Sequence, residues 1–331
     1  MKALVVCTGG GIGDVLLATP VMRALRSRYD EVIVLTTFGR GEILRGNPDI
    51  ADMWFDEGSL WAMSRRIAAA HFDASITTWA TARTALLPFL AGVPTRVGQT
   101  RRLYSGLFTH RVAVRSESGD HETHWTRILL DFSRALGCDV VDATPVFVVD
   151  SKARAEANAV LAALGVREPF AILHPTRGIS MHKAWPTQRL GELGKALGER
   201  LGVQMLISGS EADRAIAEDV ARRCGGVSLA GKASLGAFAA AAQRARCVVA
   251  MDSGPMHVAA AVGAPTVGIF AMQCDEPDRW APLGPRAAVV RASYPCPSGH
   301  RKETCPDFAC VRELRVEEIL KALDPLAVAV S

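Results

Sequence analysis

The chain has 331 residues, of which 49% are hydrophobic and 22% charged, and its length predicts two domains rather than one. Its net charge of +4 is too small over this length for a protein that wraps nucleic acid, and so much apolar material excludes a disordered chain. No unbroken run of about 18 apolar residues occurs, and Ala3–Cys7 is too short for the apolar part of a signal peptide, so we expect a cytoplasmic protein without a membrane span.

The first half of the chain alternates short β-branched runs with amphipathic segments. In chain order, this pattern predicts strands at Ala3–Cys7, Val32–Thr36 and Phe72–Thr77, and helices at Val15–Arg28, Thr81–Ala91 and His121–Leu136. Such alternation is typical of a parallel sheet with helices on both faces. The pattern stops around Pro145 and Asp150, so we expect domains at residues 1–150 and 151–331.

The same alternation restarts in the second half. It predicts strands at Phe170–His174, Val203–Ser208, Val248–Met251 and Pro265–Phe270, and helices at Thr187–Arg200, Glu211–Arg223, Leu235–Gln243, Met256–Val262 and Val316–Leu323. The expected fold class is therefore α/β, with two similar units. Open sheets of this kind bind ligands at the carboxyl ends of their strands, so functional residues should follow the strands directly.

A glycine-rich segment, Thr8–Asp14, follows the first predicted strand and leads into a helix. Dinucleotide-binding loops have this form, but Asp14 stands where their third glycine would be, and the second strand ends without the acidic residue that holds a ribose. The positive end of a helix keeps a carboxylate ionised. Asp14 is therefore either an exposed general base or a simple helix cap.

A second polar loop, Asp252–His257, follows the strand Val248–Met251 and opens a helix with an early proline. Its backbone amides, with Ser253 and His257, offer hydrogen-bond donors to an anion such as a diphosphate. The alternative is an ordinary Asp or Ser cap, with His257 as a core histidine.

Two further charged residues follow strands of the second half. Lys183 comes after the strand Phe170–His174, and it is either a neutralising charge for a leaving phosphate or a solvated surface lysine. Glu211 comes after the next strand, and it either accepts hydrogen bonds from a ribose or favours the start of a helix.

Three segments together resemble glycosyltransferase family 9, the heptosyltransferases that build the inner core of lipopolysaccharide. They are Gly11–Pro20, Lys183–Pro186 and Asp252–His257, and their order and separations match that family as well. The resemblance implies a GT-B fold of two Rossmann-like domains with the active site in the cleft between them. It also implies that the N-terminal domain binds the acceptor and the C-terminal domain binds the nucleotide sugar.

The resemblance also implies residue roles. Asp14 corresponds to the catalytic base and Lys183 to a phosphate-binding catalytic lysine, while the implied donor site consists of Thr176, Lys183, Glu211, Asp252, Ser253, Gly254 and His257. The implied reaction is inverting transfer of a heptose from ADP-heptose to a lipopolysaccharide inner-core acceptor, with no cofactor required. Acceptors of other kinds, proteins or small molecules, also occur in the family and remain an alternative.

Residues 74–116 contain six arginines and no acidic residue. Guanidinium groups suit phosphates and carboxylates, so we expect Arg96, Arg101 and Arg102, with Gly13, to bind an anionic glycolipid acceptor. The same stretch could hold the protein peripherally on the inner face of an anionic inner membrane. The alternative is a solvated basic face with structural ion pairs.

Four cysteines, Cys274, Cys296, Cys305 and Cys310, fall near the C-terminal end. Their spacing could form a small tetrahedral metal site, although Ser293 stands where many family members have the first thiol of such a cluster. We expect no metal, and either free thiols or a disulfide formed on isolation, with a structural metal as the alternative.

Two other function classes stay open at the level of sequence. An NAD(P)-dependent oxidoreductase would explain the first glycine loop but would leave the Asp252–His257 loop without a role. A nucleotide-binding module without catalytic activity would keep the second-half loops but would have no use for Asp14.

Overall fold

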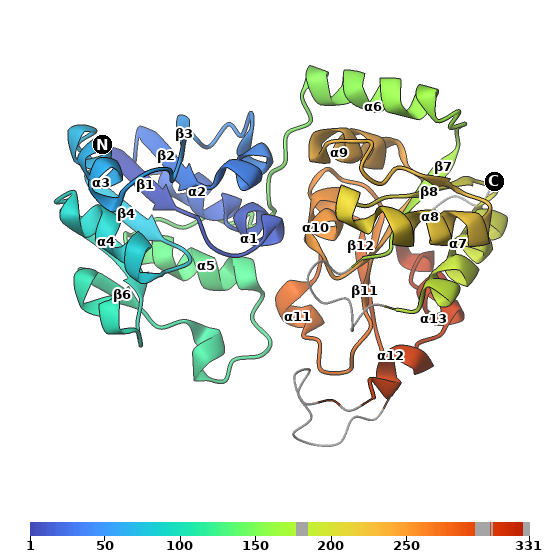
Figure 1. Ribbon diagram of the computed structural model, residues 1–331. Helices are drawn as coiled ribbons and strands as arrows, with labels where there is room; N and C mark the ends of the chain where they lie inside the picture. The colour runs from blue at the N-terminus through green and yellow to red at the C-terminus, as the bar shows by residue number, and fades with distance from the viewer. Residues whose placement is uncertain (177–184, 295–304, 306, 327–331) are drawn as a thin grey trace. The chain divides into compact units, whose positions relative to one another are not determined.

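The computed structural model describes residues 1–176, 185–294, 305 and 307–326, so Lys183 and Cys296 lie outside the described residues. The chain divides into two compact units, Met1–Val148 and Val149–Ser331, and each is built on a parallel six-stranded sheet with helices (Figure 1). The α/β fold class expected from the sequence is confirmed. Within the described ranges, none of the helices combines the length and the apolar character needed to cross a bilayer.

The first unit follows the βα alternation, with more elements than the sequence pattern predicts. Its strands are β1 Lys2–Val6, β2 Glu31–Thr36, β3 Asp52–Phe55, β4 Ala74–Thr77, β5 Thr95–Gln99 and β6 His110–Val112. Its helices are α1 Ile12–Leu17, α2 Thr19–Leu25, α3 Leu60–Ala69, α4 Ala82–Leu90 and α5 Trp125–Arg134, with the 3-10 turns η1 Phe38–Leu44, η2 Leu103–Leu107 and η3 Arg115–Ser118.

The second unit repeats this arrangement. Its strands are β7 Phe170–His174, β8 Gln204–Ile207, β9 Val227–Ser228, β10 Val248–Met251, β11 Thr266–Phe270 and β12 Ala287–Arg291. Its helices are α6 Ser151–Ala163, α7 Thr187–Leu201, α8 Arg214–Cys224, α9 Leu235–Arg244, α10 Gly254–Ala261, α11 Pro277–Trp280, α12 Ala309–Glu313 and α13 Val316–Lys321, with the turns η5 Glu211–Asp213 and η6 Asp324–Leu326.

The two sheets have the same strand order. In the first unit it is β3-β2-β1-β4-β5-β6, and in the second, read from the other edge, it is β9-β8-β7-β10-β11-β12. The direction of winding therefore reverses between β1 and β4 and again between β7 and β10. Ligands of open α/β sheets bind at this reversal, outside the carboxyl ends of the strands.

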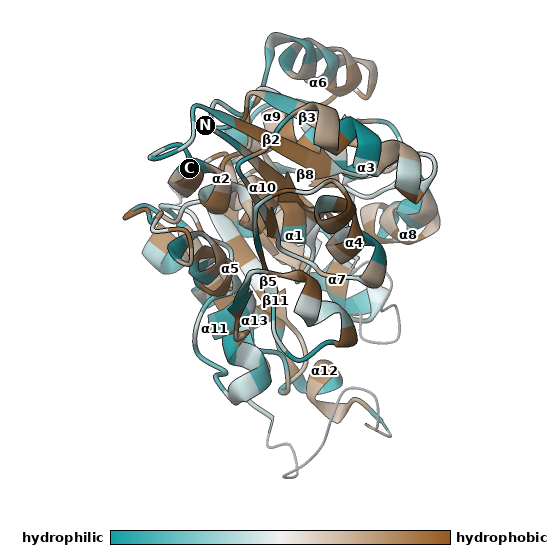
Figure 2. Ribbon diagram, turned by 90° about the vertical axis from the view of Figure 1, so that its left-hand side faces the viewer, coloured by the Kyte–Doolittle hydropathy of each residue, from teal (hydrophilic) through white to brown (hydrophobic). Residues whose placement is uncertain are grey.

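The central strands are apolar because both of their faces are covered. Leu4, Val5 and Val6 of β1 are fully buried, and Ile172 and Leu173 of β7 are fully buried as well. Strands covered on both faces carry continuous apolar runs rather than alternating ones. Figure 2 shows this as brown strands, seen clearly at β2 and β8, among helices with teal faces.

One predicted helix, Val15–Arg28, is divided into α1 and α2 at Ala18. Pro20 lies in the first turn of α2, where its missing N–H would be unpaired in any case. The same ring would clash with the carbonyl of Leu16 in a continuous helix. The Thr19 hydroxyl donates a hydrogen bond to that carbonyl at 2.7 Å, so the break leaves the oxygen paired.

Candidate active site

The first unit presents Asp14 and Trp79 at its strand reversal. β1 and β4 are parallel neighbours, with Val6 opposite Thr77, and the segments that leave them carry these two side chains. Both side chains lie against the same glycine loop. A side chain built on Gly9 would overlap the Trp79 indole, with only 1.9 Å between Cβ and Cδ1, and one built on Gly10 would lie 2.4 Å from the Asp14 Oδ2.

The glycine loop is shaped to receive the Asp14 carboxylate. Gly10 has φ +71°, a left-handed conformation that side chains rarely adopt, and Asp14 folds back over it. The backbone amide of Gly11 donates a hydrogen bond to the Asp14 Oδ2 at 2.6 Å. Asp14 therefore does cap the short helix α1, and one oxygen of its carboxylate accepts the capping hydrogen bond.

Asp14 is less exposed than the sequence suggested. The side chain is half-buried, and burial raises its pKa above the ordinary value of an aspartate. The Gly11 hydrogen bond and the positive charge of Arg40 lower the pKa, but they do not outweigh the loss of hydration. A raised pKa makes a carboxylate a stronger base once it is deprotonated, which suits proton abstraction.

Sequence reasoning missed Arg40 and Trp79. Arg40 lies on η1 and donates a hydrogen bond to the Thr8 carbonyl, which fixes the start of the glycine loop near Asp14. Trp79 is 42% exposed, and its indole meets Trp125 edge to face with ring centroids 6.4 Å apart. An exposed indole beside a carboxylate provides an apolar platform for a ring-shaped ligand. The only signal in the sequence is a tryptophan shortly after a predicted strand.

The second unit has a buried polar chain where β7 and β8 end. The Thr176 hydroxyl lies 3.3 Å from His174 Nε2, and His174 Nδ1 lies 3.0 Å from the Ser208 hydroxyl. Burial lowers the pKa of His174 to about 4, so the ring is neutral at physiological pH. A neutral imidazole held from both sides fixes the hydroxyl of Thr176, one of the expected donor-site residues.

The loop after β10 begins the helix α10, as the sequence predicted. Ser253 is the N-cap residue, but its hydroxyl donates backwards to the Met251 carbonyl at 2.8 Å instead of capping the first turn. The backbone amide of Asp252 donates to Ile269 of the neighbouring strand at 3.0 Å, which ties the loop to β11. Gly254 begins the helix, and His257 is buried, with only 5% of its surface exposed.

Glu211 begins η5 directly after the segment that leaves β8. Its side chain is exposed and forms an ion pair with Arg214. A side chain on Gly231, which has φ +69°, would lie 2.0 Å from the Glu211 Oε2, so the glycine keeps room for the carboxylate. Of the remaining expected donor residues, Lys183 lies outside the described part of the chain.

The arginines expected to bind the acceptor also make contacts within the first unit. Arg96 donates to the Leu107 carbonyl at 2.8 Å and to the Val93 carbonyl at 2.6 Å. Arg101 donates to the Glu117 carbonyl at 2.5 Å, and Arg102 forms an ion pair with the Glu117 carboxylate. Gly13 is the second residue of α1, directly before Asp14. Arg101 and Arg102 remain exposed, so both can still meet an anion.

The described cysteines lie in different environments. Cys274 is exposed, Cys305 is half-buried, and Cys310 is buried in the core of the second unit. The Cys305 thiol accepts a hydrogen bond from the Phe308 amide at 3.3 Å. Among the residues that the structure describes, no three His, Cys, Asp or Glu side chains form a group able to hold a metal ion, and Cys296 is not among them.

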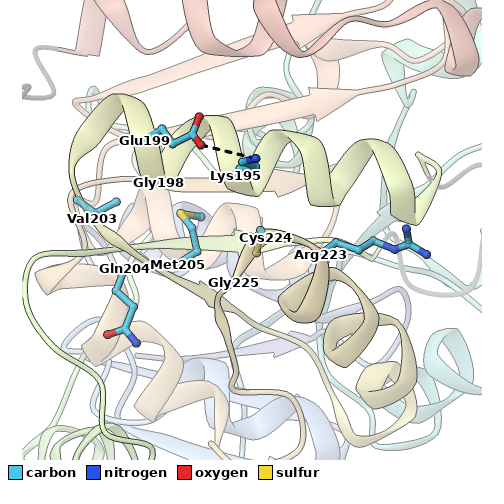
Figure 3. Close-up of a pocket in the computed structure, with 9 residues that line it drawn as sticks. All are labelled: Lys195, Gly198, Glu199, Val203, Gln204, Met205, Arg223, Cys224 and Gly225. Atoms are coloured by element: carbon cyan, nitrogen blue, oxygen red, sulfur yellow. Dashed lines mark ion pairs between the residues drawn. The ribbon is translucent and has the colours of Figure 1, made fainter.

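A pocket of about 450 Å³ lies in the second unit at the amino end of β8, away from the carboxyl ends of the strands (Figure 3). It is lined by Gln204 and Met205 at the start of β8, by Lys195 and Glu199 of α7, and by Cys224 at the end of α8. Because this is the amino end of the strand, the pocket is separate from the polar residues that follow β7, β8 and β10.

The chain is similar to known proteins both in sequence and in fold. The sequence model of glycosyltransferase family 9 (heptosyltransferase) matches residues 60–307. Lipopolysaccharide heptosyltransferase 3 of Escherichia coli strain K12 is 26% identical over 283 residues, which cover 78% of this chain and 79% of that protein. Lipopolysaccharide heptosyltransferase 2 of the same strain is 24% identical over 311 residues, 88% of each chain.

The solved structure of an Escherichia coli ADP-heptose lps heptosyltransferase II has the same fold. It superposes with a TM-score of 0.80 at 21% sequence identity, and the match covers 98% of both chains.

Proposed function

The chain belongs to glycosyltransferase family 9, the heptosyltransferase family, and on that premise we propose that it transfers a heptose from ADP-heptose to a lipopolysaccharide inner-core acceptor. Family membership makes the protein a glycosyltransferase, and it decides against the oxidoreductase and the non-catalytic module left open by the sequence. The relatives named for lipopolysaccharide and for ADP-heptose support the choice of acceptor and donor.

One observation carries the assignment of roles. Asp14 in the first unit and the Asp252–His257 loop in the second follow central strands of sheets with the same order, where α/β sheets bind ligands. We assign the acceptor to the first unit, with Gly13, Arg96, Arg101 and Arg102. The nucleotide sugar belongs to the second, with Thr176, Lys183, Glu211 and the Asp252–His257 loop.

The proposed reaction is a single displacement that inverts the anomeric carbon. An acceptor hydroxyl attacks that carbon while the bond from the carbon to the diphosphate oxygen breaks, and the diphosphate leaves with the electron pair. Asp14 takes the proton of the hydroxyl. Lys183 and the backbone amides at the start of α10 stabilise the charge that develops on the diphosphate, so no acid is needed for the leaving group.

Calorimetric titration and a turnover assay test the proposal together. ADP is expected to bind more tightly than UDP or NAD, and ADP-heptose is expected to yield product with a truncated lipid A acceptor. Tighter binding of NAD than of ADP, or no transfer from ADP-heptose to any lipid A acceptor, would contradict the assignment. A matched panel of ADP-hexoses, tested under the same conditions, separates recognition of the nucleotide from recognition of the sugar.

The pKa of Asp14 predicts an acidic limb in the pH profile of kcat/KM. Transfer needs the carboxylate, so activity falls as the pH drops through the Asp14 pKa, which burial holds above the ordinary aspartate value. Arg40 lowers that pKa, so Arg40→Ala is expected to move the limb to higher pH. Arg45→Ala, an exposed arginine five residues away, is the control. An identical limb in all three proteins would argue against Asp14 as the titrating group.

A further inference from the structure

The first unit carries an apolar pocket between α4 and η2, which we call the α4–η2 pocket. It has a volume of about 430 Å³ and is lined by Ala82, Leu86, Leu103, Tyr104, Gly106 and Leu107. η2 follows β5 directly, so the pocket lies at the carboxyl edge of the sheet, as Asp14 does. Every residue of the lining belongs to the first unit.

Large apolar side chains are exposed on the elements that form the pocket. Leu103 is 106% exposed, and Phe89, on the same helix as Leu86 and three residues further on, is 44% exposed. Side chains three apart on a helix lie on one face. Apolar side chains that gather on an exposed surface mark interaction surfaces in soluble domains.

The exposure of Leu103 is built into a fixed turn. The Ser105 hydroxyl donates to the Gln99 carbonyl at 2.7 Å, and the Tyr104 hydroxyl donates to the Ala80 carbonyl. Arg96 donates to the Leu107 carbonyl at 2.8 Å, and its guanidinium lies 5.4 Å from the Phe89 ring centre. The turn is therefore held at Tyr104, Ser105 and Leu107, while Leu103 at its start is fully exposed.

The stretch of chain that forms this apolar surface also carries cationic side chains that are not paired with a carboxylate among the described residues. Residues 74–116 contain no acidic residue, and three of their arginines pair with carboxylates: Arg83 with Asp56, Arg115 with Asp131, and Arg102 with Glu117. Arg111 lies on the edge strand β6, where its backbone pairs with Gly98, and its side chain is exposed, with no hydrogen bond or ion pair to the described residues. Arg101 donates to the Glu117 backbone carbonyl, and no carboxylate among the described residues pairs with its charge.

From this combination we propose that the α4–η2 pocket docks the protein on an anionic lipid bilayer. Leu103 enters the acyl region, a lipid chain fills the pocket, and Arg101 and Arg111 meet the phosphates of the headgroups. An apolar projection with adjacent cations is the chemistry that binds an anionic membrane surface without spanning it. The proposal rests on the proposed function in one respect: docking matters because the acceptor is lipid-linked.

Vesicle co-sedimentation of the full chain tests the docking without any turnover. The wild-type protein is expected to bind phosphatidylcholine vesicles that contain phosphatidylglycerol, to bind pure phosphatidylcholine vesicles far more weakly, and to be released by salt. Leu103→Glu is expected to weaken the binding by about tenfold, and Arg111→Gln by about fivefold. Val141→Glu changes another residue that is 95% exposed, away from α4 and η2, and is expected to bind as the wild type does.

Wild-type protein that ignores anionic vesicles, or Leu103→Glu that binds them as tightly as Val141→Glu, would overturn the proposal. Because Leu103 is fully exposed, its replacement removes nothing from the core, and an unchanged circular dichroism spectrum checks this. Turnover on a deacylated, water-soluble acceptor is expected to be the same for Leu103→Glu and wild type. Vesicle binding without transfer would count against the proposed function alone, and transfer without vesicle binding against the docking alone.

Discussion

Replacing Asp14 with asparagine is expected to lower kcat by roughly 10²–10⁴-fold, the usual contribution of a general base, while the affinity for ADP stays unchanged. The reason is that the proposed role of Asp14 is to accept a proton from the acceptor hydroxyl, and the residues proposed to bind the donor all belong to the other unit. Steady-state kinetics with saturating donor, together with calorimetry of ADP binding, separates the two effects.

The asparagine variant is chosen because it keeps the cap of α1. Its side-chain oxygen can still accept the hydrogen bond that the Gly11 amide donates to Asp14. Burial raises the pKa of Asp14, so ionising this carboxylate lowers the stability of the fold at any pH above the ordinary aspartate pKa. Asp14→Asn removes the charge, and its melting temperature at neutral pH is therefore expected to equal or exceed that of the wild type. A loss of turnover therefore reports chemistry and not unfolding.

Asp150 supplies the matched control. It is the N-cap residue of α6, and its carboxylate accepts a hydrogen bond from the Ala153 amide at 2.7 Å, as Asp14 accepts one from Gly11. Asp150→Asn is expected to keep full turnover. If Asp14→Asn and Asp150→Asn retained equal activity, Asp14 would be a helix cap and nothing more.

The strands that the sequence predicts well are those buried on both faces. Phe170–His174 and Val248–Met251 coincide with β7 and β10, because every residue in these two strands is buried and all but His174 are apolar. β5 was missed, since only Val97 and Gly98 of its five residues are buried, and β12 was missed because only Val290 is. Peripheral strands are held by their neighbours in the sheet, and short-range apolar patterns do not record that pairing.

The residues of the candidate site show the same difference between local patterns and contacts made by distant segments. Asp14 and the Asp252–His257 loop could be singled out from the sequence because each follows a predicted strand, whereas Thr176 was implied only by the family resemblance. Arg40 and Trp79 could not, since their nearness to the glycine loop depends on η1 and on the pairing of β1 with β4. Contacts between distant segments follow from the strand order, and the local pattern leaves that order open.

Trp185→Ala is expected to destabilise the second unit by about 3–5 kcal/mol, the typical cost of removing a large buried aromatic side chain. Trp185 is 1% exposed and belongs to the core cluster that contains Leu173 of β7 and Leu190 of α7. It lies two residues after Lys183 and directly before Pro186, the N-cap residue of α7. The indole therefore fixes the start of α7, close in sequence to Lys183.

Urea unfolding of the full chain, followed by circular dichroism, measures the change as a shift in the transition of the second unit. Trp61→Ala is the matched control, because Trp61 is 63% exposed on α3 and its removal is expected to change stability by no more than about 0.5 kcal/mol. A Trp185→Ala protein that unfolds at the wild-type urea concentration would contradict the packing role.

Trp185→Phe separates packing from hydrogen bonding. The indole N–H of Trp185 is buried and finds no acceptor among the described residues, so phenylalanine removes no hydrogen bond that the structure records. Most of the stability lost in Trp185→Ala is therefore expected to return in Trp185→Phe. If the Trp185 side chain positions Lys183 for donor binding, the affinity for ADP falls in Trp185→Ala under conditions where that variant is still folded. The affinity then recovers in Trp185→Phe. Equal ADP affinity in both variants would separate the anchor from the donor site and leave Trp185 a residue of the core alone.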